Sequence, residues 1–235
     1  MKFGFLAVFV FCFCLNNICA QSYHHSKYLD SIIKLNKIIL EENPINEIGI
    51  QYSKTSLELS EKINHDSLTI VSHRRLAYYY SRERNQKLFD VHANKGLKLA
   101  KELNSAYDIG YLASYKGSMF MFNQINDSAY YYYSKSVEAF EQIDRQDMVA
   151  ASLINLSHIQ RHEKDFIGSE ESAIRAIEIT KQLPKTEVQL DDLWILYNGL
   201  GINARGLKLY SKSLNYFNES ISIAKSMKDG LYNKL

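Results

Sequence analysis

The stretch YNGLGINA at residues 197–204, followed by LYSKSLNYFNESI at residues 209–221, decides the fold. Its first part carries an aromatic residue, then Leu-Gly, then a larger apolar residue. Its second part carries a small, an aromatic and a small residue at spacings of four and three, namely Ser213, Phe217 and Ser220. Small residues at helical spacing let two helix backbones approach closely, so the stretch predicts a pair of packed helices.

The same pattern recurs in register before this stretch. The position that opens the second helix of each pair falls at Gly49, Phe89, Ala129, Ser169 and Ser213, so the copies are 40, 40, 40 and 44 residues apart. Only Phe89 departs from the small residue expected there. A fixed period of this length is typical of repeat proteins, in which each helix pair buries its apolar face against its neighbours.

On these positions the chain resembles the tetratricopeptide repeat (TPR) family, in a long form with about 40 residues per repeat instead of 34. The resemblance implies an all-α, right-handed superhelical solenoid of antiparallel helix pairs with about five repeats. Within the family, the chain resembles the extracytoplasmic TPR regions of bacterial sensor and regulator proteins. We expect repeats at approximately 30–65, 66–105, 106–146, 147–185 and 190–228, with residues 229–235 starting a further helix.

Turn and capping signals fall where the predicted helices have to end or begin. Pro44 follows the first helix, and Asp165 precedes a second helix. Asp66, Ser105 and Asp147 stand before first helices, where short polar side chains cap free N–H groups. No alternating run of Val, Ile and Thr is long enough for a sheet. The sequence therefore predicts ten main helices and no strand.

The first twenty residues have the features of an export signal. Lys2 gives a short basic start, residues 3–15 are apolar, and Ala20 is a small residue at the expected cleavage site. Thirteen residues in a helix reach about 20 Å, short of the roughly 30 Å hydrocarbon core. We therefore expect residues 1–20 to be a secretory signal peptide, with an uncleaved anchor as the alternative. The mature chain, 21–235, is then periplasmic or secreted.

Composition excludes several classes of function for the mature chain. All three cysteines lie in the predicted signal, at positions 12, 14 and 19, so no disulfide framework, thiolate metal site or cysteine nucleophile is expected. A net charge of +2 lacks the basic excess of nucleic-acid binders. No second apolar run approaches the length of a membrane span. With no phosphate loop or nucleophile elbow either, we expect no cofactor and no enzymatic activity.

His158 and His162 are the one candidate pair of metal ligands. They are four residues apart, so both rings can lie on one face of a helix. The zinc-protease form of such a pair needs Glu directly after the first histidine, and Ile159 stands there. No third ligand is evident, so we expect ordinary surface histidines and no metal. A pH-responsive role stays open, because histidine titrates near neutrality.

The candidate functional surface follows from helix geometry. In the second repeat, Leu76, Ala77 and Tyr80 define the packing side of the first helix. In the TPR family the opposite side lines a concave groove that receives peptides. The residues expected there are Arg74, Tyr78, Arg82, Tyr111, Ser118, Phe122, His158, Arg161, His162, Asn198 and Arg205. Four arginines without an opposing acid favour an acidic peptide or a carboxylate. The alternative is a merely solvated inner face.

These observations predict an exported scaffold that binds a protein or peptide. The export signal together with the repeats is similar to the sensory region of a bacterial envelope regulator, whose output domain would lie beyond Leu235. One alternative is a self-contained secreted or periplasmic assembly scaffold. Another, from a different class, is a hydrolase or glycan-binding protein that uses the groove.

Overall fold

The computed structural model describes residues 25–41, 44–184 and 186–232, so the predicted signal peptide lies outside the described residues. Within these ranges the chain forms ten helices and no strand. The helices belong to two compact units, Met1–Leu99 and Ala100–Leu235. The all-α class and the consecutive packing of helices are confirmed. None of the described helices is both long and apolar enough to span a membrane.

Unit 1 begins with a helix over residues 25–41 and continues with α2 (Asn46–Lys62), α3 (Asp66–Arg82) and most of α4 (Gln86–Glu102). Hydroxyl groups link α2 to α3 in the buried contact between them. The Ser72 hydroxyl donates to Ser56 Oγ at 3.0 Å, and the Thr69 hydroxyl donates to Ser60 Oγ at the same distance. Such pairs satisfy polar groups that small residues bring into the interior.

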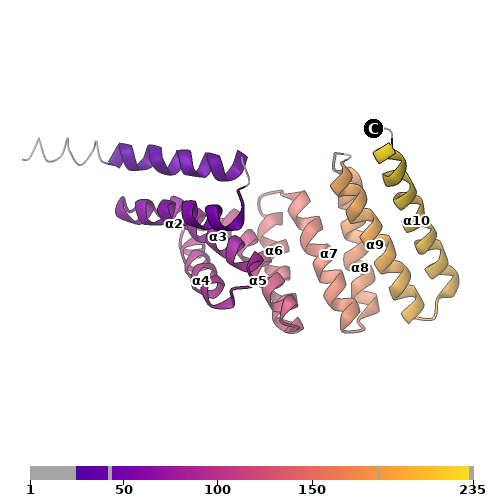
Figure 1. Cartoon of the computed structure of the whole chain (residues 1–235). Coiled ribbons are helices and arrows are strands. Elements are labelled where there is room, and N and C mark those ends of the chain that lie inside the picture. Colours follow the sequence, from indigo (N-terminus) through magenta and orange to yellow (C-terminus); the bar gives the residue numbers. More distant parts are fainter. Residues whose placement is uncertain (1–24, 42–43, 185, 233–235) are drawn as a thin grey trace, which may run out of the picture. The chain divides into compact units, whose positions relative to one another are not determined.

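Unit 2 contains α5 (Ala106–Phe122), α6 (Asn126–Glu141), α7 (Gln146–His162), α8 (Phe166–Gln182), α9 (Glu187–Gly206) and α10 (Tyr210–Tyr232). Each helix packs on the next one in the chain, and α7 also contacts α9 (Figure 1). One apolar core runs through the unit, and its members include Tyr133, Phe140, Leu153, Leu196 and Leu200. The first helices α7 and α9 are therefore neighbours, as the repeat pattern predicts.

The small residues of the pattern lie beneath aromatic rings. A Cβ added at Gly201 of α9 would stand 2.6 Å from the ring of Phe217 on α10. A Cβ added at Gly117 of α5 would stand 2.9 Å from the ring of Tyr133 on α6. Each aromatic side chain thus rests directly on the backbone of the first helix in its own pair. This contact explains why glycine stands sixteen residues before the aromatic residue in both of these pairs.

The turns between helices repeat one backbone conformation every twenty residues. Its members are Asn64, Arg84, Asn104, Gln124, Asp144 and Lys164, and Lys208 follows after the longer step, all with φ between 51° and 64°. The next N–H closes each turn by donating to a carbonyl five residues earlier, as His65 does to Ser60 at 2.9 Å. This is the left-handed C-terminal cap that usually takes glycine. The connection from α8 to α9 differs, because Leu183 is extended and Pro184 follows.

Of the three predicted N-caps, Ser105 is confirmed and Asp66 and Asp147 are displaced, while Asp165, predicted as a turn signal, caps α8. Ser105 accepts from the Asp108 N–H at 3.4 Å, and the Asp165 carboxylate accepts from the Gly168 N–H at 3.0 Å. The cap of α3 is His65, so Asp66 is the first helical residue. Asp147 likewise lies in the first turn of α7, after the cap at Arg145. Both acids remain favourable there, because the helix N-terminus carries partial positive charge.

The C-terminal helix is longer than its predecessors. α10 runs without a break through Tyr232, so residues 229–232 form its end and no separate helix starts there. Residues 233–235 lie outside the described residues.

Candidate functional site

The predicted groove residues fall on the first helices of both units. Arg74, Tyr78 and Arg82 lie on α3 of unit 1. The others lie on three helices of unit 2: Tyr111, Ser118 and Phe122 on α5, His158, Arg161 and His162 on α7, and Asn198 and Arg205 on α9. Their surroundings differ, and only some of them are available to a ligand.

Arg161 lies across the contact between α7 and α9. Its guanidinium packs over Gly199, where an added Cβ would stand 2.5 Å from Nη1. Burial lowers the pKa of Arg161, because a charged group loses water in this position. Among the described residues no acid forms an ion pair with Arg161. A half-buried positive charge without a carboxylate is costly, and a bound anion would relieve that cost.

Two histidines accompany Arg161 in the last turns of α7. The pKa of His158 is lowered, first by burial and then by the charges of Arg161 and His162, so His158 is neutral at pH 7. His162 is exposed, with its Nδ1 3.3 Å from Asn126 Nδ2 and 3.9 Å from a Glu163 carboxylate oxygen. Asn126 also donates to Glu163. The positive charge of this region therefore belongs mainly to Arg161, and Glu163 is held by Asn126.

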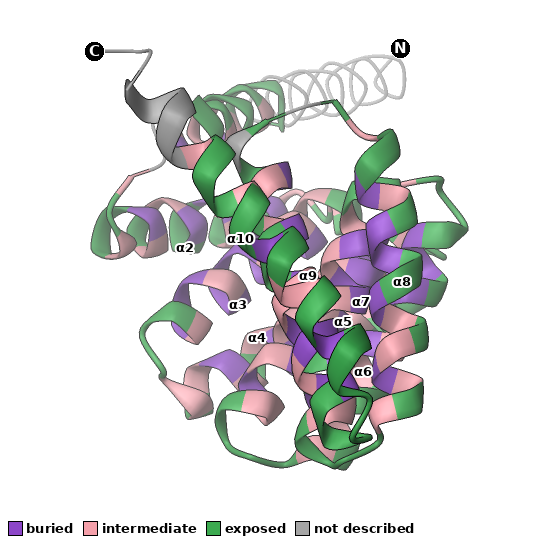
Figure 2. Cartoon of the chain, turned by 90° about the vertical axis from the view of Figure 1, so that its right-hand side faces the viewer, coloured by how far each residue is buried: buried purple, intermediate pink, exposed green. Residues whose placement is uncertain are grey.

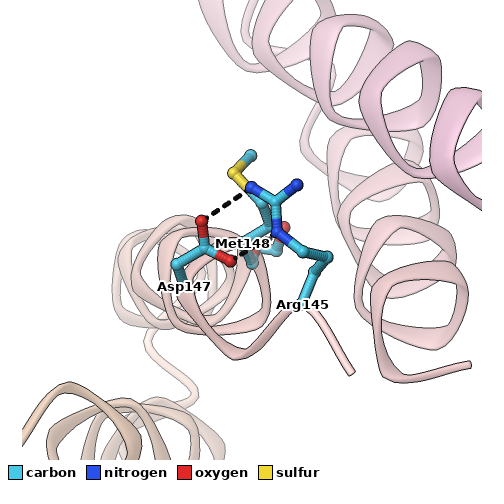
Figure 3. Close-up of polar contacts among 4 residues, drawn as sticks. Arg145, Asp147 and Met148 are labelled. Carbon is cyan, nitrogen blue, oxygen red and sulfur yellow. Dashed lines mark hydrogen bonds and ion pairs between the residues drawn. The ribbon is translucent and has the colours of Figure 1, made fainter. Parts of the chain in front are cut away.

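Arg145 at the start of α7 contrasts with Arg161. Figure 3 shows its guanidinium forked on Asp147, with Nε donating to Oδ1 at 2.9 Å and Nη2 donating to Oδ2 at 2.8 Å. The pair raises the pKa of Arg145 and lowers that of Asp147. The Tyr107 ring lies 5.8 Å from the same guanidinium. Arg145 is thus neutralised within the chain, and a ligand would have to displace Asp147 to reach it.

The α5 residues contribute less than the sequence suggests. The Ser118 hydroxyl is 2.8 Å from the Tyr133 hydroxyl, so it serves the packing of α5 on α6. Tyr111 stands edge-on against Phe140 at 5.1 Å, and burial raises its pKa. Phe122 remains half exposed. Only Phe122 of this group offers apolar surface to a partner.

The two predicted groove residues on α9, Asn198 and Arg205, lie in different surroundings. Arg205 is exposed near the end of α9. Asn198 lines an open cavity of about 510 Å³ between α9 and α10, together with Trp194 and Ile221. Helix periodicity alone does not reveal this cavity, because its second wall comes from another helix. Trp194 lines the cavity and is 40% exposed, which the sequence alone does not show.

On α3, Tyr78 and Arg82 form a local pair. The Arg82 guanidinium donates to the Tyr78 hydroxyl at 2.7 Å and lies 5.6 Å from the centre of its ring. Arg74 is half buried on the same helix. The exposed guanidinium of Arg82 is therefore oriented by a neighbour four residues away.

A pair of histidines in unit 1, one buried and one half-buried, was not anticipated from the sequence. His73 of α3 and His92 of α4 approach with their Nδ1 atoms 2.9 Å apart, and the Tyr80 ring stacks on His92 with centroids 5.6 Å apart. Burial is the main cause that lowers both pKa values to about 4. Both rings are thus neutral at pH 7, with one Nδ1 donating and the other accepting.

Metal chemistry finds no support in the described part of the chain. It contains no cluster of three or more His, Cys, Asp or Glu side chains placed to hold an ion. The prediction for His158 and His162 stays that of surface histidines.

Comparison with known proteins finds likeness in structure and none in sequence. No family model matches the chain, and no curated protein matches it. The structure of BtubC (BKLC) from P. vanneervenii has a TM-score of 0.66 at 15% identity, over 89% of this chain and 92% of that one. The apo form of RapI has a TM-score of 0.71 at 18% identity, over 88% and 73%.

A third solved structure, that of the MamA protein, has a TM-score of 0.59 at 13% identity, over 88% of this chain and 96% of that one. The three are helical repeat proteins of the TPR type. At these identities the likeness concerns the fold. This chain therefore has the fold of the TPR-type helical repeat proteins.

Proposed function

We propose that this chain is an exported scaffold that binds a protein or peptide partner, without catalysis, and that it forms the sensory region of a bacterial envelope regulator. The TPR-type fold supports an interaction scaffold. The basic and apolar start of the chain, with a small residue at position 20, supports export. A self-contained assembly scaffold is the alternative, and a membrane span encoded after Leu235 in the gene would decide for the regulator.

Arg161 is the observation that carries the binding proposal. Its guanidinium is partly desolvated against Gly199, and no described acid pairs with it. Arginine presents a planar fork that fits a carboxylate, and a desolvated charge pair contributes more than one in water. The partner is therefore an acidic segment or a terminal carboxylate. That the α3 residues join the same surface stays a prediction.

The change Arg161→Glu is expected to weaken binding of the envelope partner at least about 30-fold, because removing a desolvated charge contact costs about 2–5 kcal/mol. The measurement is pull-down from envelope extract of the source organism, followed by titration of the captured protein. Arg175→Glu is the matched control, since Arg175 is exposed on α8 and pairs with Glu141. Circular dichroism should show equal folding. Equal retention of every partner by both variants would place binding elsewhere.

Export makes a separate prediction about the N-terminus. Protein purified from its source is expected to begin at Gln21, because signal cleavage follows the small residue of the signal. Intact-mass analysis measures this directly, with cyclisation of Gln21 as an allowed further loss. A mature form that retains residues 3–15 would contradict export by cleavage. It would leave the binding proposal untouched.

A further inference from the structure

The side of α9 that faces α7 carries a second half-buried charge besides Arg161. Asp192 stands seven residues before Gly199, and seven residues make two turns, so both lie on one face of α9. Asp192 is half-buried, as Arg161 is. Burial and then the charge of Asp191 raise the pKa of Asp192, and no cation of the described residues forms an ion pair with its carboxylate.

Asp192 and Arg161 do not neutralise each other. The guanidinium of Arg161 lies over Gly199, and two helical turns separate Gly199 from Asp192 by about 10 Å along the axis of α9. An ion pair needs its nitrogen and oxygen within about 4 Å of each other. Each of the two charges is thus half-buried without an opposite charge among the described residues, and an opposite charge on a ligand would offset the cost of that burial.

An exposed apolar residue lies between the two charges. Ile195 follows Asp192 by three residues and precedes Gly199 by four, so it shares their face of α9. It is 43% exposed, whereas Leu196 beside it is 1% exposed in the core. Figure 2 shows many buried residues, in purple, around α7 and α8, on which α9 packs. Ile195 stays outside that core. We call Asp192, Ile195 and Arg161 together the α9 strip.

The order of groups in the α9 strip defines the shape of a matching ligand. The strip presents a negative, an apolar and a positive group over about 10 Å, so a matching ligand presents a cation, an apolar group and an anion over the same length. A helix does this on one face with residues at i, i+4 and i+7. Residues on one face of an extended chain are two or four apart, which gives about 7 or 13 Å, and neither length matches.

We propose that the α9 strip binds a helix of the partner that carries a basic and an acidic residue seven positions apart, with an apolar residue between them on the same face. The basic side chain pairs with Asp192, the apolar one packs on Ile195, and the carboxylate pairs with Arg161. This inference rests on the proposed function, because it makes the acidic group bound by Arg161 one part of a longer motif. It adds a cation, which an acidic segment alone does not supply.

The test uses three synthetic helical peptides as probes. The first is a labelled, alanine-based peptide of about 20 residues with capped ends, long enough to be helical alone, with lysine at i, leucine at i+4 and glutamate at i+7. The second has glutamine in place of the lysine, and the third has glutamine in place of the glutamate. In titrations with the mature chain followed by fluorescence anisotropy, the first peptide is expected to bind at least about fivefold more tightly than either of the others, because partly desolvated ion pairs contribute more than those in water.

Two variants of the chain identify which charge each end of the peptide contacts. Asp192→Asn keeps the shape of the side chain and removes a half-buried charge, so it should melt at the same temperature as the unchanged chain or higher. It should bind the first and second peptides equally tightly, because the lysine has lost its partner. Arg161→Gln should likewise bind the first and third peptides equally tightly. Glu178→Gln is the matched control, since Glu178 is exposed on α8, and it should keep both preferences.

The outcomes separate this inference from the proposed function. If the unchanged chain binds the first and second peptides equally, or if Asp192→Asn still prefers the first, the α9 strip does not read a cation and the inference is overturned. An acidic partner for Arg161 would remain. Absence of binding by the first peptide also overturns the inference, and the pull-down with Arg161→Glu then tests the proposed function by itself.

Discussion

Gly201→Leu is expected to lower the free energy of unfolding by about 3 kcal/mol, the upper end of what overpacking of a core commonly costs. The reason is the contact between α9 and the ring of Phe217. A Cβ alone would already stand 2.6, 2.7 and 2.9 Å from three ring carbons. The rest of a leucine side chain can be placed only by moving the ring or separating the helices. Unfolding should remain cooperative, because neighbouring repeats stabilise one another.

Urea denaturation followed by circular dichroism measures this change. Ala93→Leu tests the same principle in unit 1, since Ala93 is 0% exposed on α4. The control is Asn215→Leu, which adds the same side chain at an exposed position of α10. That control should stay within about 0.5 kcal/mol of the unchanged chain. Two core variants with unaltered midpoints would show that the repeat register is wrong.

The second large effect is a loss of stability in acid that comes from His73 and His92. Their folded pKa values are about 4, against 6.5 in the absence of burial. Between these values the unfolded chain binds more protons, so stability falls as pH is lowered from 6.5 towards 4. Protonation also places hydrogen on both Nδ1 atoms, which are 2.9 Å apart. Lys95 acts on both rings and Lys54 also acts on His92, so the neighbouring charges that shift these pKa values are positive and oppose protonation.

The expected loss for the pair is about 3 kcal/mol between pH 7 and pH 4.5, less than the full shifts would supply because His92 is partly exposed and the two sites are coupled. Urea denaturation at the two pH values gives the difference. His92→Phe removes one titrating group while retaining a ring for Tyr80 to stack on. The His92→Phe variant should be less stable than the unchanged chain at pH 7, and its free energy of unfolding should fall by less between pH 7 and pH 4.5. His162→Gln, at an exposed site, should behave as the unchanged chain. A loss as large in His92→Phe as in the unchanged chain would contradict this account.

The parts of the fold that the sequence predicts are those where packing restricts residue type. Gly117, Gly201, Ala129 and Ala173 had to be small for helices to touch, and the structure buries each of them. Their spacing therefore predicted the helix pairs in the correct register. Three of the four extra residues near Pro184 appear in the structure as a longer helix, because α9 has 20 residues where α7 has 17. The connection before α9 differs in conformation, with Leu183 extended.

The turns carried no comparable signal. Arg84, Gln124 and Lys164 adopt the left-handed conformation without being glycine or asparagine. An L-residue there costs only about 1–2 kcal/mol, so the rest of the repeat can impose it on any side chain. The boundary after Leu99 was equally hidden, because α4 crosses it without a proline, glycine or serine linker.

The candidate site also has a part that the sequence predicts and a part that it does not. The outward position of Arg161 follows from its place in the helix, and sequence analysis selected it. Its packing on Gly199 and the pairing of Arg145 with Asp147 depend on geometry between or at the ends of helices. His73 and His92 lie on different helices, and their contact does not follow from a fixed spacing in the sequence. A single sequence does not carry that information.

The equal turns also set how this chain can change in length. Asn104 and Asp144 are forty residues apart and share one backbone conformation, so the chain leaves the segment between them in the direction in which it entered. A duplication of residues 105–144 would insert one complete repeat, and the turns at both of its ends would be of a kind that the protein already contains. An added piece that is not a whole repeat would present the wrong helix face to the next one. Growth by gene duplication would therefore proceed in steps of one repeat. The step of 44 residues is the exception, and most of its extra length lies in α9, which has 20 residues where α7 has 17.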